Sequence, residues 1–218
     1  MWCDSAHQYN IIRRSLKHMA SLSIVIPAYN EEQNVAAACE EISNVAQRLG
    51  MDYEIILVND GSKDRTGEIG RQLAERLPNF RLVEHFPNRG YGGALKAGFA
   101  AAHKDWVAFV PADKQFDFQE IDRLLAEIES ADIVCGYRAQ RNDPFVRRFN
   151  AFGWNSLVRL LFGYLARDID CGFKLFRREI LERINLVSNG AMVDTEFLAG
   201  AKARNLRIVE VPVTHLPR

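Results

Sequence analysis

The sequence contains no run of apolar residues near the roughly 18 to 20 positions that a membrane-spanning helix needs. Its first twenty residues also lack the apolar stretch of a signal peptide. The four cysteines are far apart and form no C-x-x-C pair, which argues against a zinc site and against a disulfide framework. With 28 basic and 28 acidic residues, the formal charge is zero and draws in no nucleic acid. These absences favour a cytoplasmic protein that does not span a membrane.

The chain has 218 residues, of which 48% are hydrophobic, and this is enough for one substantial core. Residues 1–20 show no clear strand or helix pattern, and a second Met, at position 19, stands just ahead of the first expected strand. We therefore predict a loose N-terminal extension over 1–20 and a single domain over 21–218.

Short β-rich runs alternate with helical patterns through most of the chain, which is typical of crossover units on a mainly parallel sheet. Between the first two strands, apolar residues from Val35 to Leu49 return to one face of a helix that Gly50 ends. Strands are expected at 22–26, 53–58, 81–84, 106–110, 133–136 and 207–213. Further helices are expected at 64–77, from about 91, at 121–128 after a cap at Asp117, at 145–165 and at 192–205.

Polar, turn-forming segments follow four of these strands, at residues 27–31, 59–62, 88–93 and 111–115. In open sheets of this type, ligands bind beyond the carboxyl ends of the strands. A dehydrogenase is excluded because the first strand is followed by Pro-Ala-Tyr-Asn-Glu rather than G-x-G-x-x-G, and there is no Walker A sequence.

Four ordered motifs carry a resemblance to a known family: IVIPAYNEE at 24–32, VNDGS at 58–62, NRG through ALKAG at 88–98, and DCGFKLF at 170–176. Over residues 22–218 the chain resembles family 2 glycosyltransferases, and among them the dolichol-phosphate mannose synthase-like polyprenyl-phosphate sugar synthases. The resemblance implies an α/β, Rossmann-like nucleotide-sugar-binding fold of the GT-A type, with a mainly parallel central sheet flanked by helices.

The same resemblance assigns the donor side. Base and ribose would lie near Pro27, Tyr29, Glu31 and Asp60, because carboxylates accept hydrogen bonds from ribose and ring N–H groups and a tyrosine offers a flat face to a base. The diphosphate would lie near Arg89, Gly90 and Lys96, at the start of a helix. Turn formation and capping, or a solvated helix face for Lys96, are the structural alternatives.

Members of the family usually carry an Asp-x-Asp element after the fourth strand, but here it reads Pro111-Ala112-Asp113-Lys114-Gln115. The resemblance implies that Asp113 and Gln115 hold a divalent metal, Mg²⁺ or Mn²⁺, beside the reacting phosphates, with Asp113 also catalytic. One carboxylate, one amide oxygen, substrate phosphates and water suit a hard cation. The proline removes the first acid, which leaves a catalytically silent relative as an alternative.

The stretch 138–167 holds six arginines against one acid, Asp143, and is rich in aromatic and aliphatic residues. We expect it to lie at the inner face of a membrane and its arginines to bind an anionic lipid phosphate. An amphipathic helix packed on the sheet, or on a second copy in a homo-oligomer, is the alternative. Arg138, which we also predict to be catalytic, Asp170 and Lys174 are the acceptor-side candidates, with ion pairs inside the fold as their alternative role.

The predicted reaction is inverting transfer of a sugar from a nucleotide sugar to a polyprenyl or dolichyl phosphate. GDP-mannose is the first expected donor and UDP-glucose the second, while a soluble glycosyltransferase with another acceptor is the rival enzyme. A phosphate monoester is already largely ionised near pH 7, so no general base is required, and no His–carboxylate pair is evident in the sequence.

Overall fold

The computed structural model describes residues 21–139, 153–154 and 158–217. The predicted extension over 1–20 and most of the helix predicted at 145–165 lie outside the described residues. Seven strands make one sheet; they are β1 (Leu22–Ala28), β2 (Tyr53–Asn59), β3 (Phe80–Glu84), β4 (Trp106–Phe109), β5 (Ile133–Arg138), β6 (Lys174–Arg177) and β7 (Ile208–Val213). The helices described within these residues are α2 (Val35–Leu49), α3 (Thr66–Arg76), α4 (Tyr91–Ala101), the 3₁₀ helix η1 (Phe118–Glu120), α5 (Ile121–Leu125), α7 (Ile180–Arg183) and α8 (Met192–Ala203).

The strand order is β3-β2-β1-β4-β6-β5-β7, and every pairing is parallel except those of β6 with β4 and with β5. The six predicted strands are therefore present and the sheet is mainly parallel, as expected. The short antiparallel strand β6 was not predicted. It is only four residues long and begins with a lysine, so its sequence carries no clear strand pattern.

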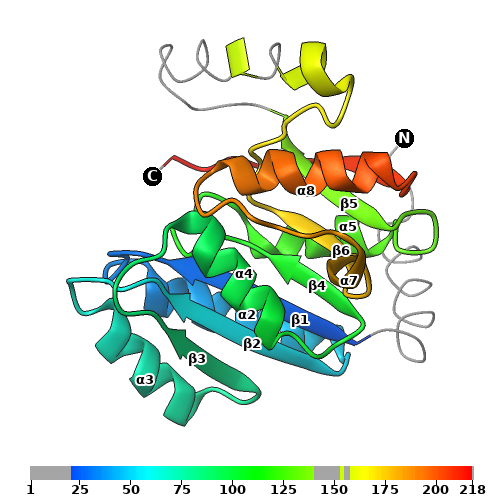
Figure 1. Ribbon diagram of the computed structural model, residues 1–218. Helices are drawn as coiled ribbons and strands as arrows, with labels where there is room; N and C mark the ends of the chain where they lie inside the picture. The colour runs from blue at the N-terminus through cyan, green and yellow to red at the C-terminus, as the bar shows by residue number, and fades with distance from the viewer. Residues whose placement is uncertain (1–20, 140–152, 155–157, 218) are drawn as a thin grey trace.

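Alternate residues of the strands face two separate cores. Ile24 of β1 and Ile55 of β2 pack with α2, η1 and α5 on one face, whereas Val25 and Ile56 pack with α4 and α8 on the other. Figure 1 shows α4, α7 and α8 in front of the sheet and α2 behind it. All seven apolar residues that define the predicted face of α2 are buried, and Gly50 ends that helix in a left-handed conformation, as predicted.

The order of the strands switches at β1. The chain continues from β1 to β2 and β3 on one side, and β4 then pairs with the other side of β1. A crevice opens at the carboxyl ends of the strands at such a switch point. The loops that follow β1, β2 and β4 meet there, and the start of α4 joins them. The sheet topology thus places the polar loops at one edge.

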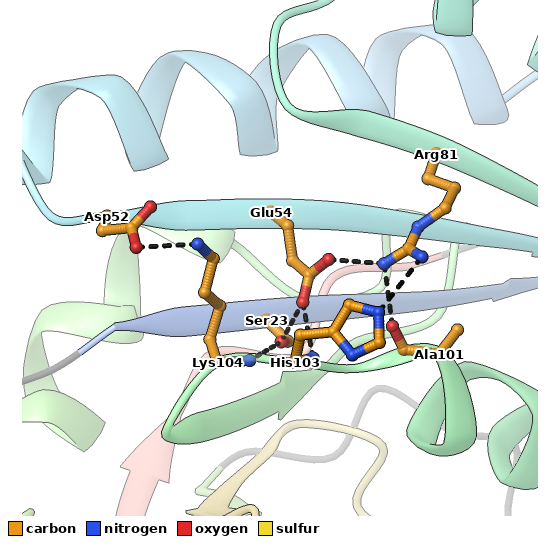
Figure 2. Close-up of polar contacts among 7 residues, drawn as sticks. All are labelled: Ser23, Asp52, Glu54, Arg81, Ala101, His103 and Lys104. Atoms are coloured by element: carbon orange, nitrogen blue, oxygen red, sulfur yellow. Dashed lines mark hydrogen bonds and ion pairs between the residues drawn. The ribbon is translucent and has the colours of Figure 1, made fainter.

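A polar cluster closes the opposite end of the sheet, where strands β1 to β3 begin (Figure 2). The Glu54 carboxylate accepts hydrogen bonds from the Ser23 hydroxyl at 2.7 Å, the His103 backbone N–H at 2.7 Å and the Arg81 guanidinium at 2.6 Å. Arg81 also donates to the carbonyl of Ala101 at the end of α4. These contacts tie three strands to the segment that leads from α4 into β4.

Candidate active site

A cavity of about 400 Å³ lies at the carboxyl ends of β1, β2 and β4 and beside the start of α4. Six of the predicted residues line it, namely Pro27, Tyr29, Glu31, Asp60, Gly90 and Asp113. Its other lining residues are Ala28, Asn88, Tyr91, Ala94, Pro111 and Ala112. Residues that the sequence places in four separate loops therefore share one wall.

The loop after β1 is held in place by the loop after β2. Asn30 adopts a left-handed conformation with φ of 55°, its N–H donates to Ser62 Oγ, and its side-chain oxygen accepts from Lys63 N–H at 2.8 Å. The neighbouring Glu31 is 8% exposed, and its carboxylate accepts from the Asn34 amide at 2.8 Å. Tyr29 is 43% exposed, so its ring is accessible to a ligand.

Asp60 is 2% exposed and accepts two hydrogen bonds on Oδ1. Its partners are Nδ1 of the buried His85 at 2.7 Å and the Arg89 backbone N–H at 2.9 Å. A His–carboxylate pair is therefore present, although none was evident in the sequence, since Asp60 and His85 are 25 positions apart and meet only because each directly follows one of the adjacent strands β2 and β3. His85 lines neither of the cavities described in this section, so the pair orients Asp60 within the wall.

The first turn of α4 is already occupied by the chain itself. The backbone N–H groups of Gly92 and Gly93 donate to the carbonyl of Asn189 at 2.7 and 3.3 Å. A Cβ atom on Gly92 would lie 2.5 Å from the Ser188 carbonyl oxygen, so glycine permits this close approach. These two N–H groups are thus engaged by the chain itself, whereas Gly90, which is predicted to lie near the diphosphate, lines the cavity.

The two cations predicted near the diphosphate line neither cavity. The Lys96 ammonium donates to the Val187 carbonyl at 2.8 Å and to Asn189 Oδ1 at 2.7 Å. Arg89 is exposed and contributes its backbone N–H to Asp60. Lys96 therefore holds the loop that covers the start of α4, which is neither of the roles weighed from the sequence.

A second cavity of about 190 Å³ adjoins the first. Tyr91, Pro111 and Asp113 line both of them. The second cavity is also lined by Gln115, Phe116, Arg138, Asp170, Gly172, Ala191, Asp194 and His215. The structure thus separates most predicted donor-side residues from Arg138 and Asp170 and places Asp113 at the junction.

Asp113 and Gln115 are brought together by a tight turn. Lys114, between them, is left-handed with φ of 58°, and the Gln115 backbone N–H donates to Asp113 Oδ1 at 3.1 Å. No group of three His, Cys, Asp or Glu side chains suited to a metal occurs in the described part of the chain. The carboxylate and amide fit a hard cation that takes its remaining ligands from phosphates and water. Asp117 caps the following helix by accepting from Gln119 N–H, as predicted.

Arg138 lies at the end of β5 and is held by Asp168. Its Nε and terminal nitrogen donate to the two carboxylate oxygens at 2.6 and 2.7 Å, and the Arg138 and Asp168 side chains are 11% and 7% exposed. This two-point pairing fixes the plane of the guanidinium. Arg138 is therefore both in an internal ion pair and on the wall of the second cavity.

The two candidates from the DCGFK motif, Asp170 and Lys174, have different surroundings. Asp170 lines the second cavity, where desolvation and the neighbouring Asp194 carboxylate raise its pKa. Lys174 is completely buried, lines neither cavity and pairs with Asp194 at 2.6 Å. In this geometry Lys174 does not reach an acceptor in the second cavity, because its side chain points from β6 into the core.

The described end of the basic stretch carries an apolar surface. Leu160, Leu161 and Phe162 are 82%, 65% and 48% exposed, while Val158 beside them is buried in the core. Arg159 lies over the ring of Tyr164, 4.9 Å from its centre. The other arginines of the stretch between 140 and 152 lie outside the described residues. Among the residues that the structure describes, none forms a helix with the length and apolar content to span a bilayer.

Sequence reasoning missed Tyr91, Asp194 and His215. Tyr91 sits between the glycines of a motif already noted, and burial with the nearby Asp194 carboxylate raises its pKa well above the usual range. Tyr91 and Asp194 both line the second cavity. The position of Tyr91 inside the NRGYGG segment was the one available signal, whereas Asp194 and His215 reach the site only through the tertiary fold.

Two curated relatives show what the chain resembles. The dolichyl-phosphate beta-glucosyltransferase of Dictyostelium discoideum is 33% identical over 213 residues, covering 88% of this chain and 65% of the relative. The undecaprenyl-phosphate 4-deoxy-4-formamido-L-arabinose transferase of Edwardsiella ictaluri is 34% identical over 205 residues, covering 93% and 62%. The chain thus spans just under two thirds of the length of these relatives.

Solved structures agree on the fold. Glucosyl-3-phosphoglycerate synthase from Mycobacterium tuberculosis superimposes with a TM-score of 0.75 at 22% identity, covering all of this chain and 80% of that one. Its complex with Mn²⁺, uridine diphosphate and glucosyl-3-phosphoglycerate gives a TM-score of 0.73 at 21% identity, covering 100% and 79%. The predicted GT-A fold is confirmed. The model of the family named Glycosyl transferase family 2 matches residues 23–184, and the chain belongs to that family.

Proposed function

We propose that this chain transfers a sugar from a nucleotide sugar to a polyprenyl phosphate, with inversion at the anomeric carbon. The observation that carries the proposal is the pair of adjoining cavities that share Asp113. The larger one offers the aromatic ring and carboxylates that suit a nucleoside, and the smaller one contains the guanidinium of Arg138. A sugar bound at the junction would be within reach of both sides.

In the proposed step, an oxygen of the acceptor phosphate attacks the anomeric carbon from the side of the second cavity. The bond between that carbon and the donor diphosphate oxygen breaks, and its electron pair leaves with the nucleoside diphosphate. Arg138, oriented by Asp168, holds the acceptor phosphate. No protein base takes part, because the phosphate is already ionised.

Asp113 and Gln115 would hold a divalent metal, which supplies positive charge to the departing diphosphate. Complexes of the structural relative with uridine diphosphate and Mn²⁺ or Mg²⁺ support this assignment. Because the two protein ligands are few, the diphosphate itself must complete the coordination shell. Metal and donor are therefore expected to bind together.

UDP-glucose replaces GDP-mannose as the first donor to test. The relatives are named as glucosyltransferases and as a formamido-arabinose transferase, and none of those reported above is named as a mannosyltransferase. The mannose assignment made from the sequence thus gains no support, whereas its glucose alternative does.

We also propose that the enzyme works at the cytoplasmic face of a membrane. The exposed Leu160, Leu161 and Phe162, with Arg159 and Arg167 nearby in the chain, suit the boundary between lipid headgroups and acyl chains. A polyprenyl phosphate has its phosphate at that level. The relatives' names, which specify dolichyl or undecaprenyl phosphate, support the same acceptor class.

A transfer assay tests the proposal. Purified protein is incubated with UDP-glucose or GDP-mannose, with Mg²⁺ or Mn²⁺, and with either a short polyprenyl phosphate or a water-soluble alcohol. We expect glucosyl phosphoprenol, and we expect Asp113→Asn to abolish its formation while the circular dichroism spectrum stays unchanged. Transfer to the soluble alcohol alone would contradict the proposed acceptor.

A catalytically silent nucleotide-sugar-binding protein is the second candidate, and Pro111 is the observation that favours it. Pro111 lines both cavities at the position where the resemblance to the family implies an acid. Its ring lies against Gly172, 2.8 Å from where a Cβ of that residue would be. If the natural chain binds UDP-glucose without turnover and Pro111→Asp creates turnover, the silent function holds. Turnover by the natural chain excludes it.

A further inference from the structure

Lys174 is a fully buried lysine whose ammonium group is surrounded by three acceptors. It donates to the carbonyl of Ile169 at 3.0 Å, to the carbonyl of Cys171 and to Asp194 Oδ1 at 2.6 Å. An ammonium has three N–H donors, so every donor has a partner. Burial disfavours its charge, but the Asp194 carboxylate outweighs burial and raises the pKa of Lys174, so the side chain stays charged.

The three partners either line the second cavity or directly adjoin a residue that lines it. Ile169 and Cys171 flank Asp170, so the ammonium binds the backbone immediately before and after a residue of the cavity wall. Asp194 is the buried acid near the start of α8, and it lines the second cavity together with Tyr91, whose pKa its carboxylate helps to raise. One charge therefore connects the loop that carries Asp170, helix α8 and the tyrosine shared by both cavities.

We propose that Lys174 is a positioning residue that holds Asp170 and Tyr91 in place around the acceptor phosphate and the sugar. This inference rests on the function proposed above. Lys174 acts only through its neighbours, since its side chain is 0% exposed and does not reach either cavity. The consequence is a specific defect: loss of the ammonium loosens the wall of the acceptor cavity and leaves the far part of the donor cavity, around Tyr29 and Asp60, intact.

The test compares the full chain with Lys174→Met, which keeps the length of the side chain and removes its charge. Glu54→Gln is the matched control, because it breaks a partly buried charge contact of the same 2.6 Å length at the opposite end of the sheet. Hydrogen–deuterium exchange followed by mass spectrometry is measured on peptides covering 165–176, 86–95 and 53–62. Steady-state kinetics then gives KM for a short polyprenyl phosphate and for UDP-glucose.

We expect Lys174→Met to speed exchange at least tenfold over 165–176, while 53–62 exchanges as in the natural chain. We expect a roughly tenfold higher KM for the acceptor and an unchanged KM for the donor. Glu54→Gln is expected to change neither KM. Where Lys174→Met does not fold, Asp194→Asn, which keeps an oxygen in place but removes the counter-charge, is measured for the same pattern.

The inference is overturned if exchange over 165–176 is unchanged in a folded variant, or if both KM values rise together. It is also overturned if Glu54→Gln raises the acceptor KM equally, since general loss of stability would then explain the effect. A natural chain without any transfer activity refutes the proposed function but not the positioning role, which the exchange data decide alone.

Discussion

Glu54 provides a prediction whose size follows from its contacts. Its carboxylate accepts from Ser23, His103 N–H and Arg81 within 2.6 to 2.7 Å, and its side chain is only 13% exposed. In Glu54→Gln the amide oxygen can keep the Ser23 and His103 contacts, whereas the charge-assisted contact to Arg81 is lost. Hydrogen bonds to charged groups contribute about 1.5–3 kcal/mol, and the partial exposure of Arg81 places this loss near about 1.5 kcal/mol.

The pH dependence identifies the cause. Desolvation raises the pKa of Glu54, but the hydrogen bonds from Ser23, His103 and Arg81 outweigh it and lower that pKa below its ordinary value of 4.5. A carboxylate whose pKa is lowered by folding adds stability above the unfolded-state pKa, and this stability is lost as the pH falls through the folded-state pKa. The difference between the natural chain and Glu54→Gln is therefore constant near neutral pH and shrinks below pH 4.5.

Urea unfolding and, separately, thermal unfolding, both followed by tryptophan fluorescence, measure this difference. We expect a melting temperature lowered by roughly 3 to 6 °C at pH 7 for a chain of this size, with an unchanged dependence of the unfolding free energy on urea. A destabilisation that stays the same down to about pH 3 would refute the reasoning, because it would not come from the charge of Glu54. A destabilisation below about 0.3 kcal/mol would place the cluster with ordinary surface ion pairs.

Two further predictions concern residues around the sheet. Burial raises the pKa of Cys39, Cys135 and Cys171 to about 12, so we expect iodoacetamide to label them at pH 8 only after urea unfolding, as read by peptide mass spectrometry; rapid labelling of the native chain would contradict their placement. Gly92→Ala is expected to lower stability by about 1–3 kcal/mol, since its Cβ would meet the Ser188 carbonyl oxygen at 2.5 Å. Gly190→Ala, in the loop that carries Ser188 and with nothing within 4 Å of the added Cβ, is the control and should unfold like the natural chain.

Local sequence patterns predict the structural features that depend on residues close together in the chain. The apolar spacing of α2, its Gly50 cap and the Asp117 cap follow from contacts within a few positions, and the structure confirms all three. The convergence of the four polar loops was also predictable, because the carboxyl ends of parallel strands meet at one edge. Strand β6 was not, since a buried charged residue at its start contradicts the usual pattern of a central strand.

Contacts between residues distant in sequence account for the rest. Asp60 meets His85, Lys174 meets Asp194, and Lys96 meets Asn189, 93 residues away. The sequence alone does not distinguish a lysine that binds a phosphate from one that pairs with a buried acid. The burial of the side chain, which only the structure gives, distinguishes the two roles. The structure therefore gives Lys96 and Lys174 partners within the fold, and for Lys174 this is the ion pair named as its alternative, while the substrate contacts of Glu31 and Asp60 at the cavity wall remain predictions.

The measurement that tests the division into donor and acceptor cavities most directly is the KM of each substrate in two single variants. Tyr29→Ala removes a ring from the first cavity, and Arg138→Lys keeps the charge beside Asp168 but loses the planar fork in the second. We expect Tyr29→Ala to raise KM for UDP-glucose by about tenfold, in line with base stacking of 1–3 kcal/mol, and to leave KM for the polyprenyl phosphate unchanged. Arg138→Lys should do the reverse. A rise in the same KM in both variants would contradict the assignment of one cavity to each substrate.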